Sequence, residues 1–252
     1  MKIKLTGKNL QDIRPLLAQY GLSECEEPPE LVISHGGDGA MLGAIRENPG
    51  IPVFPIRDCG TAPLCPEHPC AAQLEALLAG TLKKSRLPLV CGEVHNRKIY
   101  GVNDVFLHHA DLASALRYRV VIDGELYANE VVGDGVGISS VHGSTAYYRS
   151  ITHSLFRVGI GLAFSNSTEA VNHLVLSEKS VITIEIVRGP GVLVADNSPE
   201  RIPVQEGDIV TFRQSELSAE VLGLDHFMCP KCRVLRHPNK LPFQGIFTVK
   251  ED

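Results

Sequence analysis

In the first third of the chain, short runs of consecutive apolar residues alternate with segments in which the apolar residues have helical spacing. LVIS at 31–34 is a continuous apolar run, typical of a strand buried on both faces. The predicted strands are residues 1–7, 31–34 and 51–56, and the predicted helices are 10–21, 39–48 and 70–80, with Gly21 and Gly80 at helix ends. This alternation predicts a parallel sheet with crossover helices.

After about residue 85 the pattern becomes that of β-structure. Residues 117–133 predict a hairpin with Asp123-Gly124 as its two-residue turn. Residues 180–196 repeat the pattern around a Gly-Pro-Gly turn, and residues 201–224 predict two or three further short strands. We therefore expect an α/β N-terminal domain with a parallel sheet, residues 1–100, and an all-β, sandwich-like C-terminal domain, residues 101–252. A short last strand could return to the first domain.

Composition and charge narrow the function classes. The chain has 252 residues, of which 44% are hydrophobic and 21% charged, as in ordinary globular proteins. Its formal net charge of −5 gives no overall attraction to nucleic acid or to an anionic membrane. Neither an apolar window of about 18 residues nor an apolar stretch after the N-terminal lysines occurs. We expect a cytoplasmic protein with no nucleic-acid or membrane partner.

The most unusual segment is LVISHGGDGAMLGA at 31–44, in which a strand leads through three glycines into a helix. Such a turn directs backbone N–H groups and the positive end of the helix dipole to one point, which suits phosphate. Asp38 would repel phosphate by itself. It fits if it holds Mg²⁺ against a nucleotide or takes a proton from an attacking hydroxyl. The alternative is a plain turn in which Asp38 caps the helix.

A second loop dense in small residues, GDGVGISSVHGSTAYYRS at 133–150, lies in the β-rich half. Residues 143–147, GSTAY, predict a short helical turn whose small side chains admit a ring system, with Tyr147 available to stack. In the alternative interpretation Ser144 caps a turn and Tyr147 packs in the core.

The sequence resembles the NAD kinase family in four segments taken together. These are HGGDG at 35–39, VNDVFL at 102–107, DG…GSTAY at 134–147 and the β-rich tail with EGDIVTF at 206–212. The resemblance spans most of the chain. GGDG alone is shared with lipid kinases, whereas GSTAY in a β-rich second domain is similar to NAD kinases in particular.

The resemblance implies transfer of a phosphoryl group from ATP, or polyphosphate in some members, to the 2′-hydroxyl of the adenosine ribose of NAD. It implies Mg²⁺ with the ATP, and a homodimer or homotetramer. Asp38 matches the aspartate that activates the hydroxyl. The residues matching the phosphate loop and the dinucleotide contacts are Gly36, Gly37, Gly39, Asn103, Asp104, Asp134, Ser144, Thr145, Ala146 and Tyr147.

Several positions depart from the family pattern. Ala40 replaces the usual Thr after GGDG, Asp104 replaces Glu, and His142 replaces Thr before GSTAY. After residues 51–56, the usual Asn and glycine-rich turn becomes RDCGTAPLC, which introduces Arg57. These changes leave two other hypotheses open: a kinase with a different hydroxyl acceptor, such as a lipid, and a catalytically silent dinucleotide-binding or sensor protein.

Seven cysteines without an export signal indicate free thiols or metal ligands rather than a disulfide framework. Cys229 and Cys232 in CPKC have the spacing of a zinc knuckle. The remaining ligands of a structural zinc site would be His226 and His237, or Cys65 and Cys70 of CPEHPC. The alternative is a pair of free thiols near a surface turn.

Overall fold

The computed structural model describes residues 1–25, 28–58 and 60–236. These residues form two compact units, one made of residues 1–86 together with the chain from Glu220, and one made of Leu87–Ala219. The predicted limits of 1–100 and 101–252 remain a prediction about the folding domains. The expected short C-terminal strand would lie beyond residue 236, outside the described residues.

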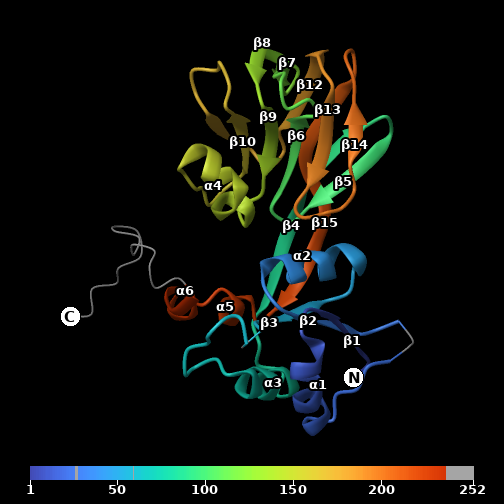
Figure 1. The fold of residues 1–252 in the computed structure, drawn as a ribbon, viewed down its shortest axis with the longest axis vertical. Helices are drawn as coiled ribbons and strands as arrows, with labels where there is room; N and C mark the ends of the chain where they lie inside the picture. The colour runs from blue at the N-terminus through green and yellow to red at the C-terminus, as the bar shows by residue number, and fades with distance from the viewer. Residues whose placement is uncertain (26–27, 59, 237–252) are drawn as a thin grey trace, which may run out of the picture. The chain divides into compact units, whose positions relative to one another are not determined.

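The first unit is a parallel sheet with helices on both of its faces. β1, β2 and β3 are adjacent and parallel, with α1 and α3 on one face and α2 on the other (Figure 1). Its elements are β1 (Ile3–Gly7), α1 (Leu10–Gln19), β2 (Leu31–His35), α2 (Asp38–Glu47), β3 (Val53–Ile56), α3 (Cys70–Leu78), α5 (Leu224–Phe227) and α6 (Pro230–Arg236). All five residues of β2 are buried, as the continuous apolar run predicts.

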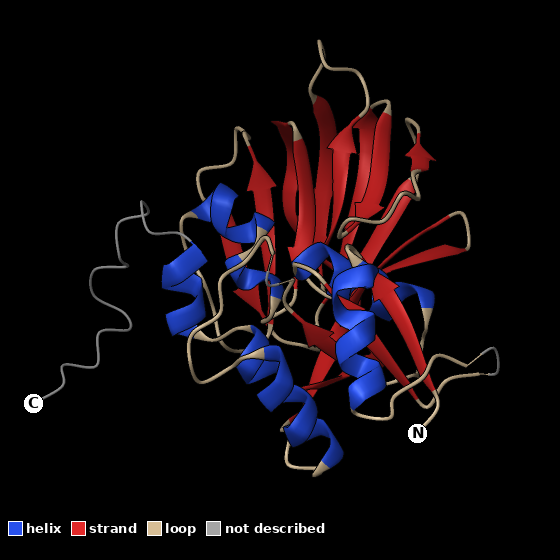
Figure 2. Ribbon diagram, turned by 60° about the horizontal axis from the view of Figure 1, so that its bottom comes forward, coloured by secondary structure: helices blue, strands red, loops and turns tan. Residues whose placement is uncertain are grey.

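The second unit consists of two antiparallel sheets, and strands dominate it (Figure 2). One sheet has the order β11-β10-β9-β6-β13-β14, and the other contains β15-β12-β7-β8. The elements are β4 (Lys84–Val94), β5 (Arg97–Gly101), β6 (Asp104–His109), β7 (Leu116–Ile122), β8 (Glu125–Gly133), β9 (Gly135–Ser139), the 3-10 turn η1 (Gly143–Thr145), α4 (Tyr147–Thr152), β10 (Ile160–Ser165), β11 (His173–Leu176), β12 (Val181–Arg188), β13 (Gly191–Ala195), β14 (Ile202–Val204) and β15 (Ile209–Leu222). The predicted fold class is confirmed.

The turn at Asp123-Gly124 is the predicted hairpin. Both residues have positive φ, 53° and 85°, and the flanking strands β7 and β8 pair directly. This is the backbone geometry that a two-residue hairpin turn with right-handed strand twist requires.

Two strand predictions were wrong in detail. The strands on either side of Gly189-Pro190 do not form a hairpin, because β12 pairs with β7 and β15 whereas β13 pairs with β6 and β14. The two strands lie in different sheets. Both direct their buried residues, such as Ile184 of β12 and Leu193 of β13, into the same core. Residues 201–224 hold two strands, within the predicted number, but only β14 is short, with three residues; β15 runs for 14 residues, and its Val221 pairs with Val53 of β3.

Candidate functional site

The glycine-rich turn after β2 carries Asp38 to the first position of helix α2. Gly36 has φ of +142°, where residues with a side chain are strained, and a Cβ there would lie 3.0 Å from Ala40 Cβ. Gly37 has φ of −94°, and among the described residues a Cβ there would meet Arg57 Nη1 at an ordinary contact distance of 3.8 Å. Gly36 is therefore needed for the turn itself, whereas Gly37 leaves the main chain accessible.

The Asp38 carboxylate is 61% exposed, and the N-cap position of α2 is occupied by Gly37 rather than by Asp38. Its Oδ1 lies 3.1 Å from Arg57 Nη2 and its Oδ2 lies 3.4 Å from Arg57 Nη1. The guanidinium thus meets both carboxylate oxygens in a fork, which fixes the plane of the carboxylate. Each oxygen keeps further acceptor capacity for another group.

Arg57 follows β3, and its side chain is held in place by Phe227 as well as by Asp38. Its side chain is only 6% exposed, its Nε donates to the Phe227 carbonyl at 3.2 Å, and its guanidinium carbon lies 3.6 Å from the centre of the Phe227 ring. A guanidinium held by a carbonyl, an aromatic face and a carboxylate has little freedom to reorient. Sequence analysis noted Arg57 only as a departure and missed its contact with Asp38.

Asp58, the next residue, ties this loop to the turn after β1. Burial raises its pKa, but hydrogen bonds from Asn9, Thr61 and the Gly60 amide have the larger combined effect, so that the net pKa is lowered. Asn9 Nδ2 donates to Asp58 Oδ2 at 2.6 Å. The ionised Asp58 therefore supports the loop that carries Arg57.

In the second unit, the segment containing Asn103 and Asp104 lies against the GSTAY loop. The Asn103 carbonyl accepts hydrogen bonds from the Ser140 amide at 2.8 Å and the Ser139 hydroxyl at 3.0 Å. A Cβ on Gly143 would stand 2.0 Å from the same carbonyl oxygen, so only glycine allows this approach. The structure thus brings together two of the predicted contact segments.

Asp104 is buried and close to a second carboxylate. Asp196 accepts hydrogen bonds from the amides of Val102, Asn103 and Asp104 at 2.7, 2.8 and 3.1 Å. Burial, with repulsion from Asp196, raises the pKa of Asp104 to about 7. Near neutral pH this side chain can therefore either donate or accept a proton, depending on what binds next to it.

The GSTAY residues have different environments. Ser144 is buried, and its hydroxyl is directed at the carbonyls of Val141 and Phe156, 2.8 and 3.2 Å away. Thr145 is exposed, and Ala146 is partly buried between η1 and α4. Ser144 therefore supports the loop from inside, and Thr145 is presented to solvent.

Tyr147 is 39% exposed and belongs to an aromatic group that sequence analysis missed. Its ring lies edge-on to Phe106 at 4.9 Å and tilted to His108 at 5.6 Å. Burial lowers the pKa of His108, as do the nearby His109 and Arg201, so the imidazole is favoured in its neutral form. Phe106 and His108 alternate with Leu107 along β6, a period-two pattern that could have indicated a shared face.

Asp134 lies apart from the GSTAY loop, at the other end of β9 from Ser139. Its Oδ2 accepts a hydrogen bond from Asn166 Nδ2 at 2.9 Å, and its carbonyl accepts one from the His109 amide. These hydrogen bonds hold Asp134 in the turn between β8 and β9.

The thiols of CPKC are buried in the first unit, which contradicts the interpretation as thiols near a surface turn. Cys229 and Cys232 gather with Cys65 and with His68, which was not predicted as a ligand. Of the other suggested ligands, Cys70 points its sulfur at the Arg57 carbonyl, 4.0 Å away, and His226 stacks on the ring of His68. His237 lies outside the described residues.

Comparison with known proteins places this geometry in a family. The family model of the ATP-NAD kinase C-terminal domain matches residues 102–224. The chain is 30% identical to an NAD kinase of Salmonella dublin over 210 residues, which is 77% of this chain and 71% of that protein. The chain belongs to the NAD kinase family. Its match to an NAD kinase of Brucella suis, 29% identical over 147 residues, spans 56% of that relative's length.

Solved structures agree on the fold of this NAD kinase family member. An NAD kinase from Archaeoglobus fulgidus in complex with ATP superposes with a TM-score of 0.73 at 18% identity, covering 92% of this chain and 99% of that one. Yeast NADH kinase complexed with NADH gives 0.69 at 19% identity, covering 98% and 80%. The described part of the chain contains no helix that qualifies as a membrane span.

Proposed function

We propose that this protein transfers a phosphoryl group from ATP, or from polyphosphate, to the 2′-hydroxyl of the adenosine ribose of NAD, giving NADP. Membership of the NAD kinase family supports phosphorylation of NAD in general. The observation that carries the proposal is the exposed carboxylate of Asp38, the first residue of α2 directly after Gly37, which is oriented by the Arg57 fork.

In the proposed reaction Asp38 accepts the proton of the ribose hydroxyl as that oxygen attacks the γ-phosphorus. The bond between the γ-phosphorus and the bridging oxygen of ATP breaks, and ADP leaves. A carboxylate within hydrogen-bond reach supplies the general base that a secondary hydroxyl needs. The fork from Arg57 would keep the carboxylate plane fixed during the transfer, so that it does not rotate out of reach.

Magnesium fits this chemistry as a partner of the nucleotide. Mg²⁺ prefers oxygen ligands, and it usually binds one or two carboxylates together with substrate phosphates. Asp38 is exposed at the glycine turn and could supply one carboxylate oxygen. In the described part of the chain, the side chains that cluster as a potential metal site are cysteines and a histidine. These are not the oxygen ligands that Mg²⁺ prefers. Bound Mg²⁺ would neutralise charge on the transferring phosphate.

In the second unit, Asn103, Asp104, Thr145, Ala146 and Tyr147 are the proposed contacts for the dinucleotide. The aromatic face of Tyr147, backed by Phe106, offers a stacking surface for a base, and the small residues beside it leave room for one. Ser144 and Asp134 would act by holding the loops, since their polar atoms face other parts of the protein.

A second candidate function has one observation in its favour. Because Arg57 engages both oxygens of Asp38, the carboxylate could be held as an ion pair in a protein that binds a dinucleotide without turnover. We favour the kinase because Asp38 stays exposed. A silent binding protein has little need for a carboxylate in a phosphate-binding turn.

The test is an assay of the purified protein for NADP and NADPH. NAD or NADH is supplied as acceptor and Mg-ATP or polyphosphate as donor, and the phosphorylated position is identified by nuclear magnetic resonance. The kinase proposal expects 2′-phosphorylated product with at least one donor. Dinucleotide binding without product with every donor would support the silent binding protein. Absence of both binding and product would indicate a different acceptor. The same samples can be examined by light scattering for the expected dimer or tetramer.

A further inference from the structure

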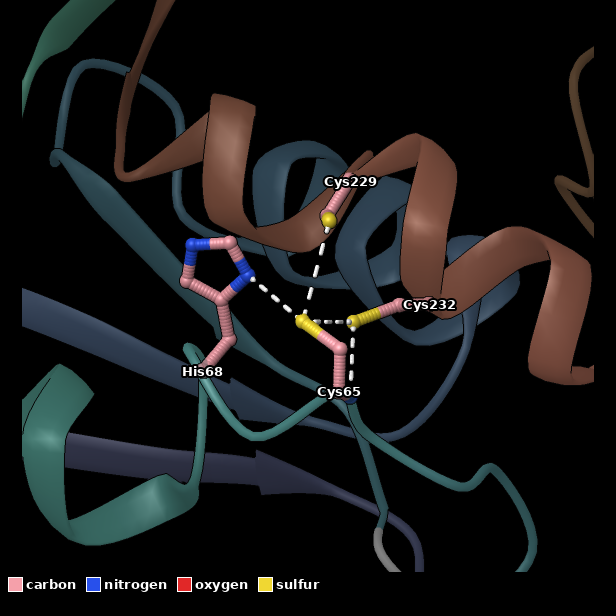
Figure 3. Close-up of side chains that lie close together, drawn as sticks. All are labelled: Cys65, His68, Cys229 and Cys232. Atoms are coloured by element: carbon pink, nitrogen blue, oxygen red, sulfur yellow. Dashed lines mark hydrogen bonds between the residues drawn. The ribbon is translucent and has the colours of Figure 1, made fainter. Parts of the chain in front are cut away.

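Four side chains from two distant segments meet in the first unit (Figure 3). Cys65 and His68 come from the loop between β3 and α3, and Cys229 and Cys232 come from the start of α6. Their ligand atoms all lie within 4.8 Å of one another. Cys65 and Cys229 are 164 positions apart in sequence, so the gathering is a product of the tertiary fold.

The distances agree with a tetrahedral metal site. Zn–S bonds of about 2.3 Å and a Zn–N bond of about 2.0 Å place ligand atoms roughly 3.5–3.8 Å apart at tetrahedral angles. Cys65 Sγ lies 3.4 Å from Cys232 Sγ, 3.9 Å from Cys229 Sγ and 3.3 Å from His68 Nδ1. The sulfur separations are far longer than a disulfide bond of about 2.0 Å.

The two segments share one local design. Cys65-Pro66-Glu67-His68 and Cys229-Pro230-Lys231-Cys232 both place two ligands three residues apart with proline after the first. The His68 amide donates to the Cys65 carbonyl, and the Arg233 amide donates to the Cys229 carbonyl. Each turn therefore directs both of its ligand side chains to the same side. This repeated C-P-x-[CH] pattern is the sequence signal that analysis of CPKC alone missed.

Further contacts hold the two turns together around the four side chains. The Cys65 amide N lies 3.2 Å from Cys232 Sγ, in position to donate a hydrogen bond to a thiolate. Glu67 and Lys231, the third residues of the two turns, form an ion pair at 2.5 Å. Hydrogen bonds and charges of this kind around a metal site orient its ligands and balance its charge.

We propose that Cys65, His68, Cys229 and Cys232 bind one structural Zn²⁺ ion. Three thiolates and one imidazole in tetrahedral arrangement are the ligands that zinc prefers. The protein fills all four positions, which is typical of a structural site rather than a catalytic one. All three cysteines are buried, so the metal would join the loop before α3 to α6 from inside the unit.

The site lies next to the group that holds Arg57. Cys229 is two residues from Phe227, whose carbonyl and ring both contact Arg57. A metal that fixes Cys229 would therefore fix the support of the Arg57 fork as well. This last consequence rests on the proposed function, whereas metal binding does not.

The test is metal analysis of the purified full chain, kept reduced, by inductively coupled plasma mass spectrometry. We expect one zinc per chain. Replacement of each ligand (Cys65→Ser, His68→Gln, Cys229→Ser or Cys232→Ser) should lower the bound zinc by at least about tenfold. Cys70→Ser and His226→Gln are the matched controls, because both residues adjoin the site without belonging to it, and these variants should keep full zinc content.

A second measurement uses the wild-type chain, in case the ligand variants fail to fold. Zinc is removed with a chelator and replaced by Co²⁺. Three thiolates should give an intense sulfur-to-cobalt absorption in the near ultraviolet, together with the visible bands of tetrahedral cobalt. Chelation should lower Tm and increase hydrogen exchange in residues 64–68 and α6. A reduced protein that neither contains nor takes up zinc or cobalt would overturn the proposal, as would stoichiometric iron or zinc retained in all four ligand variants.

Discussion

Arg57 and Asp38, 19 residues apart in sequence, are joined by two contacts, from Nη2 to Oδ1 at 3.1 Å and from Nη1 to Oδ2 at 3.4 Å. The arginine is buried and the aspartate is exposed. The pair therefore presents a carboxylate of fixed orientation to solvent, supported by a cation that cannot move away. In the proposed mechanism this orientation is what makes Asp38 an effective base.

The first prediction concerns Arg57→Lys. Lysine keeps the charge but cannot contact both carboxylate oxygens as a planar fork, so Asp38 should lose its fixed orientation. We expect kcat to fall about 10²-fold and the Kd for NAD to change little, as measured by steady-state assay and calorimetry. Arg46→Lys, on the exposed side of α2, is the control. A rise in kcat would show that Arg57 restrains Asp38 unproductively, and would contradict this role.

A second prediction separates the two glycines that begin the GGDG turn. Gly36→Ala forces a side chain into φ of +142° against Ala40, which should lower the free energy of unfolding by about 1–3 kcal/mol. Gly37→Ala meets no such strain, and should lower stability less than Gly36→Ala does, by the smaller cost of alanine at the N-cap of α2. It should weaken ATP binding, because a methyl group then covers the main chain that approaches phosphate. Thermal unfolding and ATP titration measure both. Equal stability losses in the two variants would contradict this division of roles.

The third prediction is a pH dependence of stability due to Asp104. Its pKa in the folded protein is raised to about 7 by burial and by Asp196, above the value of 3.8 for a free aspartate. The folded state therefore binds the extra proton. Its stabilising contribution should be complete below about pH 4 and be lost as pH rises to about 7, by on the order of a few kcal/mol.

Asp104→Asn should remove that slope, because an amide does not titrate. Denaturant unfolding of wild type and variant at several pH values measures the difference between them, and Asp123→Asn is a matched control on a hairpin turn. An identical dependence in wild type and Asp104→Asn would show that Asp104 does not titrate in this range.

A fourth prediction concerns Tyr147 and the dinucleotide. Loss of the ring in Tyr147→Ala should raise the Kd for NAD about tenfold, which corresponds to a stacking contribution of about 1–3 kcal/mol. Tyr147→Phe keeps the ring and its contact with Phe106, and should bind nearly as wild type does. Tyr100→Ala, at a similarly exposed tyrosine on β5, serves as control. If Tyr147→Ala binds NAD normally, the proposed contact is wrong.

Local sequence was sufficient for much of the fold. The apolar run before Gly36 predicts a doubly buried strand, and Asp123-Gly124 predicts a hairpin, because both depend on residues close in sequence. The Gly-Pro-Gly turn at 189–191 led to the wrong prediction of a hairpin. Alternation shows which residues of β12 and β13 are buried, but it does not show that the two strands belong to different sheets that share one core. The length of β15 was missed because polar residues in its middle resemble a turn.

The candidate site likewise has features that local sequence predicts and features that depend on the tertiary fold. Asp38 could be proposed from a motif of four residues, whereas its contact with Arg57 depends on β2 and β3 being neighbours in the sheet. CPKC was noticed as a pair with Cys65 as one possible partner, but the repeat of its pattern at Cys65-Pro66-Glu67-His68 was missed. That these two segments meet in space is known only from the tertiary structure. Motifs can thus indicate the chemistry of a site, while the partners that orient its side chains come from the tertiary fold.

The role of Asp38 as the base is tested by the rate of NADP formation by Asp38→Asn. NAD binding is measured on the same sample, and Glu47→Gln on the same helix is the control. Asparagine keeps the size of the side chain but cannot accept the hydroxyl proton. We predict that NADP formation is lost while the fold and NAD affinity are retained, and that Glu47→Gln behaves as wild type. Near-normal turnover by Asp38→Asn would show that Asp38 is not the base.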